Sequence, residues 1–454
     1  MIMTGNTALL LDLYELTMAQ VYFCHKRNTW STFDLFARQL PAQRSFLIAA
    51  GLEDILAYIR GLRFTPESIR YLKSLGLFSR DFLRYLAGFR FTGDIWAMPE
   101  GTAFFPQEPV VRVTAPIMEA QMVEGFLLNT INLQTMIASK AARVVLAAQG
   151  RPVYDFSLRR THGADASIKV ARSSYIAGVR GTSNVLAGKL YGMGLSGTMA
   201  HSFVMAFPGE LEAFRAYADV FGSSTILLVD TYDVSEGIRN AIRAAHELEA
   251  RGIRLSGIRI DSGDLTGISF RARRALDAAG LAYVKIIGTG NLDEFGIRRI
   301  IDCKAPIDSF GVGTHMGTSS DAPVLDVIYK MSEVTDKRRN FIPVMKFSKG
   351  KVTLPGRKQV YRRMDRPGRF VKDILALEKE KIQGMPLLVP VVKKGVVSYR
   401  VPGLEVSRRF AAESLARLPA RLKRIDRPGP YPVEMSPGLK SLRAKLTRAV
   451  HSRQ

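Results

Sequence analysis

The chain has 454 residues, of which 47% are hydrophobic, so it can bury an ample core and has the length of two or three domains. Its formal net charge of +24 favours anionic partners without choosing between nucleic acid and phosphorylated small molecules. No apolar run has the length of a membrane span or the pattern of a signal peptide, and two cysteines are too few for a zinc cluster or a disulfide framework, so we expect a cytoplasmic protein.

The first third of the chain is expected to lie outside any barrel. Residues 32–38 alternate like a half-buried strand, and residues 91–116 are strand-rich and punctuated by proline and glycine. Residues 117–148 carry apolar side chains at helical spacing, which predicts one long buried helix or two joined helices. We therefore predict an N-terminal α/β domain with a connecting helix over residues 1–148.

The middle of the chain repeats one pattern six times, in which a short apolar run leads into a cluster of glycines and polar side chains. The clusters are residues 155–160, 197–202, 230–233, 259–264, 288–291 and 311–314. The runs resemble buried parallel strands, and helical stretches such as 235–251 and 267–280 separate them. This alternation predicts an irregular TIM-like α/β barrel over residues 149–335, with its chemistry at the carboxyl ends of the strands.

The pattern changes again after residue 333. Residues 346–363 read as hairpin-like strands, and a proline-rich segment precedes a short helix at 439–449. We predict that residues 336–454 return to the N-terminal domain.

Two pairs of glycines follow the last two predicted strands. Glycines let backbone N–H groups converge on an anion, and barrels commonly place a phosphate cradle after these strands. Tight turns are the other interpretation of each pair taken alone. The residues that we expect at a phosphate are Gly288, Thr289, Gly290, Gly311, Gly313 and Thr314.

Charged side chains gather after two other strands. Arg259, Asp261, Ser262 and Asp264 suit ribose hydroxyls and a charged leaving group, with a structural ion pair as the alternative. Asp230 and Asp233 are strand-end acids that could hold Mg²⁺, as could Asp264.

Histidine is the remaining candidate for chemistry. His201 lies in Gly-Thr-Met-Ala-His-Ser at residues 197–202, at a predicted strand mouth beside small residues, although a lone histidine is more often structural. His162 and His315 are weaker candidates of the same kind.

Taken in order, these motifs resemble the nicotinate phosphoribosyltransferase family. The resemblance rests on residues 13–20, 156–163, 181–188, 197–202, 258–264 and 311–314 and covers nearly the whole chain. It implies a type II phosphoribosyltransferase, with an α/β barrel and an α/β domain built from both termini, and a homodimer with shared active sites. The implied reaction joins nicotinate to phosphoribosyl diphosphate, with ATP as co-substrate, a phosphohistidine intermediate and Mg²⁺.

The resemblance also implies roles for individual residues. His201 would be phosphorylated, Phe156 would stack on the pyridine ring, and Arg159 would contact base and phosphates. Asp261 and Arg259 would hold ribose and diphosphate, and the late glycine pairs the 5′-phosphate. Tyr14 would enter from the partner subunit, while Thr182, Ser183 and Ser202 belong to substrate-binding motifs.

The sequence leaves two other kinds of function open, a related phosphoribosyltransferase and a nucleic-acid-binding protein. Nicotinamide and quinolinate phosphoribosyltransferases share the architecture, but similar nicotinamide enzymes have an aspartate at the position matching Ser183. The neutral residue here predicts nicotinate as the base, with Asn184 and Arg159 assisting. A basic protein that binds nucleic acid would need aromatic platforms interleaved with a continuous basic stripe, and this pattern is not seen.

Overall fold

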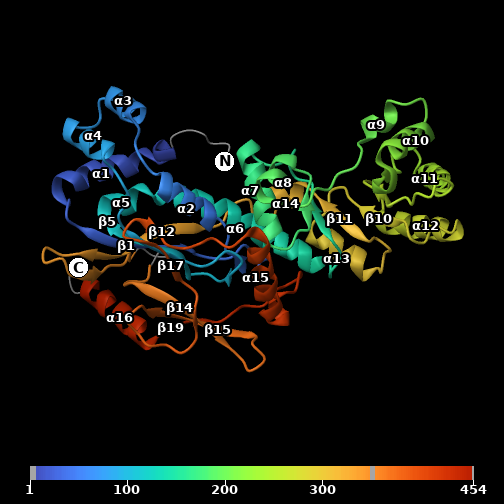
Figure 1. Ribbon diagram of the computed structural model, residues 1–454. Coiled ribbons are helices and arrows are strands. Elements are labelled where there is room, and N and C mark those ends of the chain that lie inside the picture. The colour runs from blue at the N-terminus through green and yellow to red at the C-terminus, as the bar shows by residue number, and fades with distance from the viewer. Residues whose placement is uncertain (1–6, 348–352, 452–454) are drawn as a thin grey trace. The chain divides into compact units, whose positions relative to one another are not determined.

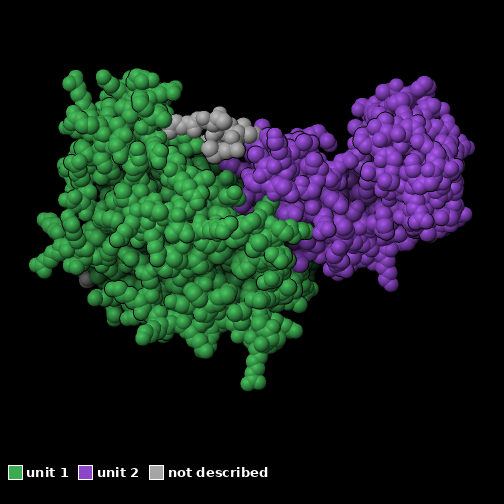
Figure 2. Space-filling view, in the orientation of Figure 1, with its two compact units in different colours: residues 1–139, 324–454 green, residues 140–323 purple. Residues whose placement is uncertain are grey.

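A computed structural model of the chain describes residues 7–347 and 353–451. The chain divides into two compact units, residues 1–139 with 324–454 and residues 140–323 (Figure 2). The predicted boundaries, after residues 148 and 335, differ from this division. Residues 327–335 form a strand of the first unit's sheet rather than of the barrel, and Lys140 and Arg143 pair with Glu294 inside the second unit.

The first unit is a mixed α/β unit (Figure 1). Its strands are β1 (Trp30–Ala37), β2 (Leu47–Ile48), β3 (Asp94–Ala97), β4 (Ala103–Phe104), β5 (Pro109–Pro116), β12 (Val327–Thr335), β13 (Phe341–Pro343), β14 (Lys358–Met364), β15 (Phe370–Leu377), β16 (Met385–Pro386), β17 (Val389–Lys393), β18 (Val396–Val397) and β19 (Val433–Met435). Its helical segments are η1 (Thr7–Leu9), α1 (Leu13–His25), α2 (Leu52–Gly61), α3 (Pro66–Ser74), α4 (Arg80–Ala87), α5 (Ile117–Met122), α15 (Leu404–Arg417), η3 (Ala420–Leu422) and α16 (Pro437–His451). Helix α6 (Glu124–Ala147) begins in this unit, so α5 and α6 are the two joined helices that the spacing allowed.

Within the described residues, a seven-stranded sheet of this unit runs in the order β13-β12-β1-β5-β3-β17-β18. A four-stranded sheet, β16-β14-β15-β19, comes from the C-terminal part of the chain. The predicted hairpin over 346–363 is corrected: β14 pairs with β15, and residues 348–352 lie outside the described residues.

Two ion pairs, of which one is buried, join the C-terminal segment to the early strands. Lys358 on β14 lies 2.7 Å from Asp34 on β1, and Arg112 on β5 lies 2.5 Å from Glu378. Both lysine and aspartate are almost fully buried, and a buried charge is tolerated only with such a partner. Together with the strand pairings β1 with β12 and β3 with β17, these pairs join distant parts of the sequence in one unit.

The second unit alternates strands and helices. Its strands are β6 (Val153–Asp155), β7 (Gly181–Thr182), β8 (Ile226–Leu228), β9 (Gly257–Ile260), β10 (Lys285–Gly288) and β11 (Ser309–Val312). Its helical segments, besides the end of α6, are α7 (Ala164–Ile176), α8 (Val185–Tyr191), α9 (His201–Met205), α10 (Glu210–Phe221), η2 (Gly222–Ser224), α11 (Val234–Glu249), α12 (Leu265–Ala278), α13 (Glu294–Asp302) and α14 (Thr314–Gly317).

These strands form a parallel sheet in the order β7-β6-β11-β10-β9-β8, of which Figure 1 labels β10 and β11. The predicted α/β class is confirmed. The closed TIM-like ring is not, because among the residues described here β7 and β8 are edge strands without a pairing between them. Five of the six polar clusters follow a strand of this sheet, and the sixth, at 197–202, follows a single parallel bridge between Thr182 and Leu195.

No helix in residues 7–347 or 353–451 is both long and apolar enough to cross a membrane. Cys24 and Cys303 are exposed and unpaired.

Candidate active site

A cavity of about 580 Å³ lies at the carboxyl ends of the strands of the second unit. The predicted residues that it brings together are Phe156, Arg159, Ser183, His201, Arg259, Asp261, Thr289, Gly290, Gly311, Gly313 and Thr314. Arg160, residues 197–200 and Asn291 complete its lining. Parallel strands end at one edge of a sheet, which is why clusters so far apart in sequence meet here.

One wall of the cavity is organised by Asp155, the last residue of β6. Its buried carboxylate accepts hydrogen bonds from Ser157 N (3.0 Å), Ser157 Oγ (2.5 Å) and Thr182 Oγ1 (2.8 Å), and its carbonyl oxygen accepts one from Ser183 N (2.8 Å). Burial raises the pKa of Asp155, while these hydrogen bonds act in the opposite direction. Asp155 thereby positions Phe156 and Ser183 beside each other at the cavity.

The half-buried Phe156 has its ring against Gly311 on the neighbouring strand β11. A Cβ at Gly311 would lie 2.6 Å from two ring carbons of Phe156 and equally close to Thr289 Cγ2. The glycine is therefore required by side-chain packing at this strand end, in addition to any role in approaching a phosphate. An aromatic face seated in this way is suited to stacking on a flat ring.

A second wall is built around Asp261. Its backbone N–H donates to Asp230 Oδ2 at 2.9 Å, and Ser262 Oγ donates to the same oxygen at 2.6 Å. Its own carboxylate accepts a hydrogen bond from Thr289 Oγ1. Gly290 has a φ of +89° and lies so close that a Cβ would overlap the Asp261 carbonyl oxygen. The loops after β9 and β10 are therefore locked together with the Asp261 carboxylate at the cavity.

His201 begins α9 and lies between two polar partners. Its Nδ1 is 3.2 Å from Thr231 Oγ1, and its Nε2 is 3.7 Å from Asp261 Oδ2. A threonine hydroxyl can donate or accept, so it can hold the ring in either tautomer. The imidazole is 41% exposed and lines the cavity, so it is open to a reactant.

Three guanidinium groups face one carboxylate in the lining. Burial lowers the pKa of Arg259, with the charge of Arg159 acting in the same direction and Asp261 and Asp230 opposing it. Arg259 Nη2 donates to Met199 O at 2.9 Å, which ties the segment before His201 to β9, while its buried Nε has no partner among the described residues. Arginines in such surroundings favour phosphate and diphosphate oxygens as ligands.

The acids near the cavity do not form a closed metal cage. The described residues contain no group of three or more histidine, cysteine or acidic side chains that could hold a metal ion. Asp233 caps α11, since its Oδ1 accepts from Glu236 N at 2.8 Å, and Asp264 opens α12 at an adjoining hollow. Asp230 Oδ1 is buried and has no hydrogen-bond partner in the described part of the chain. One or two carboxylates are enough for Mg²⁺ that arrives bound to phosphate oxygens, so Asp230 and Asp261 fit this weaker role.

Several predicted residues lie elsewhere. Thr182 is buried behind the wall, Gly288 ends β10, Ser202 is exposed on α9, and Ser262 and His315 line the adjoining hollow. Tyr14 belongs to the first unit, where burial and the carboxylates of Glu124, Glu15 and Asp12 raise its pKa. His162 is exposed in the loop before α7 and does not line the cavity.

The position of Asn184 contradicts the prediction that it assists in binding nicotinate. Its Oδ1 caps α8 by accepting from Ala187 N at 3.1 Å, and its Nδ2 donates to Ser167 Oγ at 3.2 Å. It is buried and does not line the cavity, whereas Ser183 and Arg159 do. Arg160 and Asn291 also line the cavity and were not predicted as site residues. Both belong to the polar clusters, at 155–160 and 288–291, from which the site was predicted.

Comparison with known proteins agrees with this geometry. Profiles of the nicotinate phosphoribosyltransferase N-terminal domain, family and C-terminal domain match residues 9–132, 152–349 and 383–443. Nicotinate phosphoribosyltransferase pncB2 of Mycobacterium tuberculosis is 47% identical over 444 residues, which cover 97% of this chain and 94% of that protein. The Bacillus subtilis nicotinate phosphoribosyltransferase is 36% identical, with 97% and 95% covered.

Two solved structures are also similar. The crystal structure of human nicotinic acid phosphoribosyltransferase superposes with a TM-score of 0.86 at 28% identity, covering 96% of this chain and all of that one. Nicotinate-nucleotide pyrophosphorylase from Pyrococcus furiosus gives a TM-score of 0.73 at 26% identity, with 91% and 96% covered. The chain belongs to the nicotinate phosphoribosyltransferase family.

Proposed function

We propose that this protein joins nicotinate to phosphoribosyl diphosphate, forming nicotinate mononucleotide and diphosphate in the salvage route to NAD. The observation that carries the proposal is the single cavity in which an aromatic ring, a neutral serine, three arginines and Asp261 meet. Family membership supports the same reaction.

The groups in the cavity suit the displacement at the anomeric carbon. The bond from that carbon to diphosphate breaks while the pyridine nitrogen bonds to it, so positive charge develops on the ribose and negative charge on the leaving oxygens. Asp261 is placed to accept ribose hydroxyls and stabilise the positive charge, and Arg159, Arg160 and Arg259 to neutralise the diphosphate. Phe156 would stack on the pyridine, and the backbone at Gly290, Gly311 and Gly313 would meet the 5′-phosphate.

The proposal also includes the use of ATP to phosphorylate His201. A ring nitrogen of His201 attacks the γ-phosphorus of ATP, ADP leaves, and water later cleaves the phosphoimidazole to release phosphate. Mg²⁺ bound to the phosphates would neutralise part of their charge. Asp261, 3.7 Å from Nε2, and Thr231, 3.2 Å from Nδ1, orient the ring.

The proposal is tested by assaying the purified protein with phosphoribosyl diphosphate and each of nicotinate, nicotinamide and quinolinate, with and without ATP. We expect nicotinate mononucleotide as the main product and a stimulation by ATP. Preferential turnover of nicotinamide or quinolinate would establish the alternative base instead. Salt-dependent retention on heparin without turnover of any base would favour a nucleic-acid-binding protein. A cytoplasmic location stays a prediction.

A homodimer with shared sites is also proposed, with Tyr14 on α1 of one chain reaching the cavity of the other. Tyr14 is 45% exposed among exposed apolar neighbours, Leu10 and Leu13, which suits a contact surface. Tyr14→Ala chains and His201→Ala chains should each lack ATP-stimulated turnover, and a mixture of the two should regain it through hybrid sites. A wild type that is fully active and strictly monomeric by light scattering would contradict this.

A further inference from the structure

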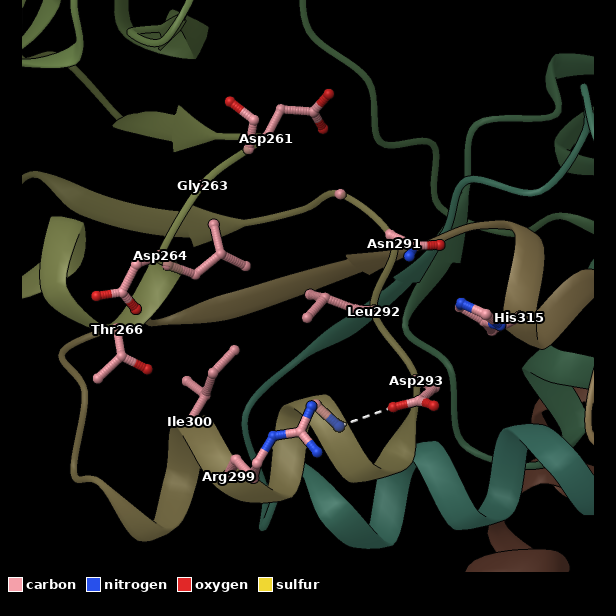
Figure 3. A pocket seen from close by; sticks show the side chains of 14 residues that line it. Asp261, Gly263, Asp264, Thr266, Asn291, Leu292, Asp293, Arg299, Ile300 and His315 are labelled. Carbon is pink, nitrogen blue, oxygen red and sulfur yellow. Dashed lines mark hydrogen bonds between the residues drawn. The ribbon is translucent and has the colours of Figure 1, made fainter.

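A second hollow of about 650 Å³ adjoins the candidate active site within the same unit (Figure 3). The two cavities share Asp261, Gly290 and Asn291, so a ligand in one can extend into the other. The hollow lies between the loops after β9 and β10 and the starts of α12 and α13. Its size is within the range of sites that take a small organic molecule.

The lining of this hollow differs in charge from that of the active-site cavity. The cavity at His201 holds three arginines and one carboxylate, whereas the second hollow holds Asp261, Asp264 and Asp293 with a single guanidinium, Arg299. A ligand spanning both would therefore be strongly anionic at one end and rich in hydroxyl or amino groups at the other. Phosphoribosyl diphosphate does not fit this description because it carries phosphate at both ends.

The rest of the lining suits a nucleoside. Leu265, Leu292 and Ile300 supply apolar surface, while the carboxylates and the hydroxyl of Thr266 supply acceptors (Figure 3). Carboxylates bind ribose hydroxyls in nucleotide sites, and a guanidinium such as that of Arg299 can stack on a base. Asp293 has one oxygen occupied, because Oδ1 accepts from Gly296 N at 2.7 Å as the cap of α13.

We infer that the second hollow receives the adenosine half of ATP while the triphosphate lies in the arginine-lined cavity beside His201. This inference rests on the proposed use of ATP. It divides ATP recognition into two parts. The phosphates are held by residues that also serve phosphoribosyl diphosphate, and the nucleoside is held by residues of which only Asp261, Gly290 and Asn291 also line the active-site cavity. ATP should then be distinguished from simple polyphosphates by this hollow alone.

The experiment compares two ligands by calorimetry: the non-hydrolysable adenylyl imidodiphosphate and inorganic tripolyphosphate. Thr266 is half-buried in the first turn of α12, and Thr266→Trp would fill the hollow with an indole. We expect Thr266→Trp to raise the Kd for the nucleotide by about tenfold or more and to leave the Kd for tripolyphosphate within about twofold. The matched control is Arg274→Trp, which puts the same side chain at an exposed position of α12 outside the hollow and should leave both Kd values unchanged.

A second variant covers the case in which tryptophan disturbs the fold. Asp293→Asn keeps the cap of α13, because asparagine caps helices as well as aspartate does, and removes one carboxylate from the hollow. It should weaken nucleotide binding by about threefold or more, with tripolyphosphate again unaffected.

Binding and turnover are measured separately, so the inference and the proposed reaction fail in different ways. An unchanged nucleotide Kd in both hollow variants, or a wild type that binds the nucleotide no better than tripolyphosphate, would overturn the inference. Absence of nicotinate turnover in a wild type that shows the expected binding contrast would overturn only the proposed reaction.

Discussion

Replacing His201 with alanine is expected to abolish phosphorylation of the protein by ATP and to remove the stimulation of nicotinate turnover by ATP. The ring is a part-exposed imidazole at the wall of the cavity, held through Thr231 and Asp261, and an imidazole nitrogen can act as a nucleophile toward phosphorus. No other histidine lines this cavity among the described residues, so no other imidazole can take over. Binding of phosphoribosyl diphosphate should persist, because the arginines and Asp261 remain.

The measurement is incubation with γ-labelled ATP, followed by acid and alkaline treatment of the isolated protein. Wild type should carry label that is lost in acid and kept in alkali, and His201→Ala should carry none. His246→Ala is the matched control, because His246 is an exposed histidine of the same unit whose Nδ1 lies 3.1 Å from Glu249 Oε2, away from the cavity. Equal labelling of the His201 variant would place the phosphoryl group elsewhere.

Ser183→Asp is expected to lower kcat/KM for nicotinate relative to nicotinamide on the order of 100-fold. Ser183 lines the cavity together with Phe156 and Arg159, so a carboxylate there would face the carboxylate of nicotinate in a partly dry pocket. The same carboxylate would accept a hydrogen bond from the amide of nicotinamide. Because the backbone of Ser183 is fixed by its hydrogen bond to Asp155 O, the change should act through the side chain alone.

Both bases are compared by kcat/KM in wild type, Ser183→Asp and Ser183→Asn. Asparagine matches aspartate in size without its charge, so Ser183→Asn should retain most of the preference for nicotinate. If the asparagine variant loses the preference as fully as the aspartate variant, volume rather than charge selects the base. If the ratio is unmoved in both, the selector lies elsewhere in the cavity.

The sequence predicted the parallel sheet well because its strands are short, apolar and buried on both faces. The apolar runs predicted before the clusters at 230–233 and 288–291 form β8 and β10. Ring closure could not be predicted, since it depends on strand tilt and on pairing between β7 and β8 rather than on the pattern of either strand. The end of the second unit was misplaced for a similar reason, because the assignment of β12 to the other sheet depends on its pairing with β1 and β13.

The site was predictable where glycine and charge coincide after a strand, as at Asp261, Gly290 and Gly311. The reason for the glycines was only partly foreseen. Packing of Phe156 against Gly311, and of the Asp261 carbonyl against Gly290, depends on which strands are neighbours. Asn184 shows the opposite failure, because its place in a substrate motif suggested contact with the base while its amide is used to cap α8.

The hydrogen bonds of Asp155 limit which changes at the candidate site could alter base specificity. Asp155 accepts hydrogen bonds from two segments. Its bond with Ser157 holds the loop that carries Phe156. Its bonds with Thr182 and with the N–H of Ser183 hold the end of β7. The two segments are thus held by the same residue, and a shift of either backbone would disturb the hydrogen bonds of the other. A change of base specificity should therefore come from exchanging the side chain at position 183, which leaves the backbone that carries Phe156 in place.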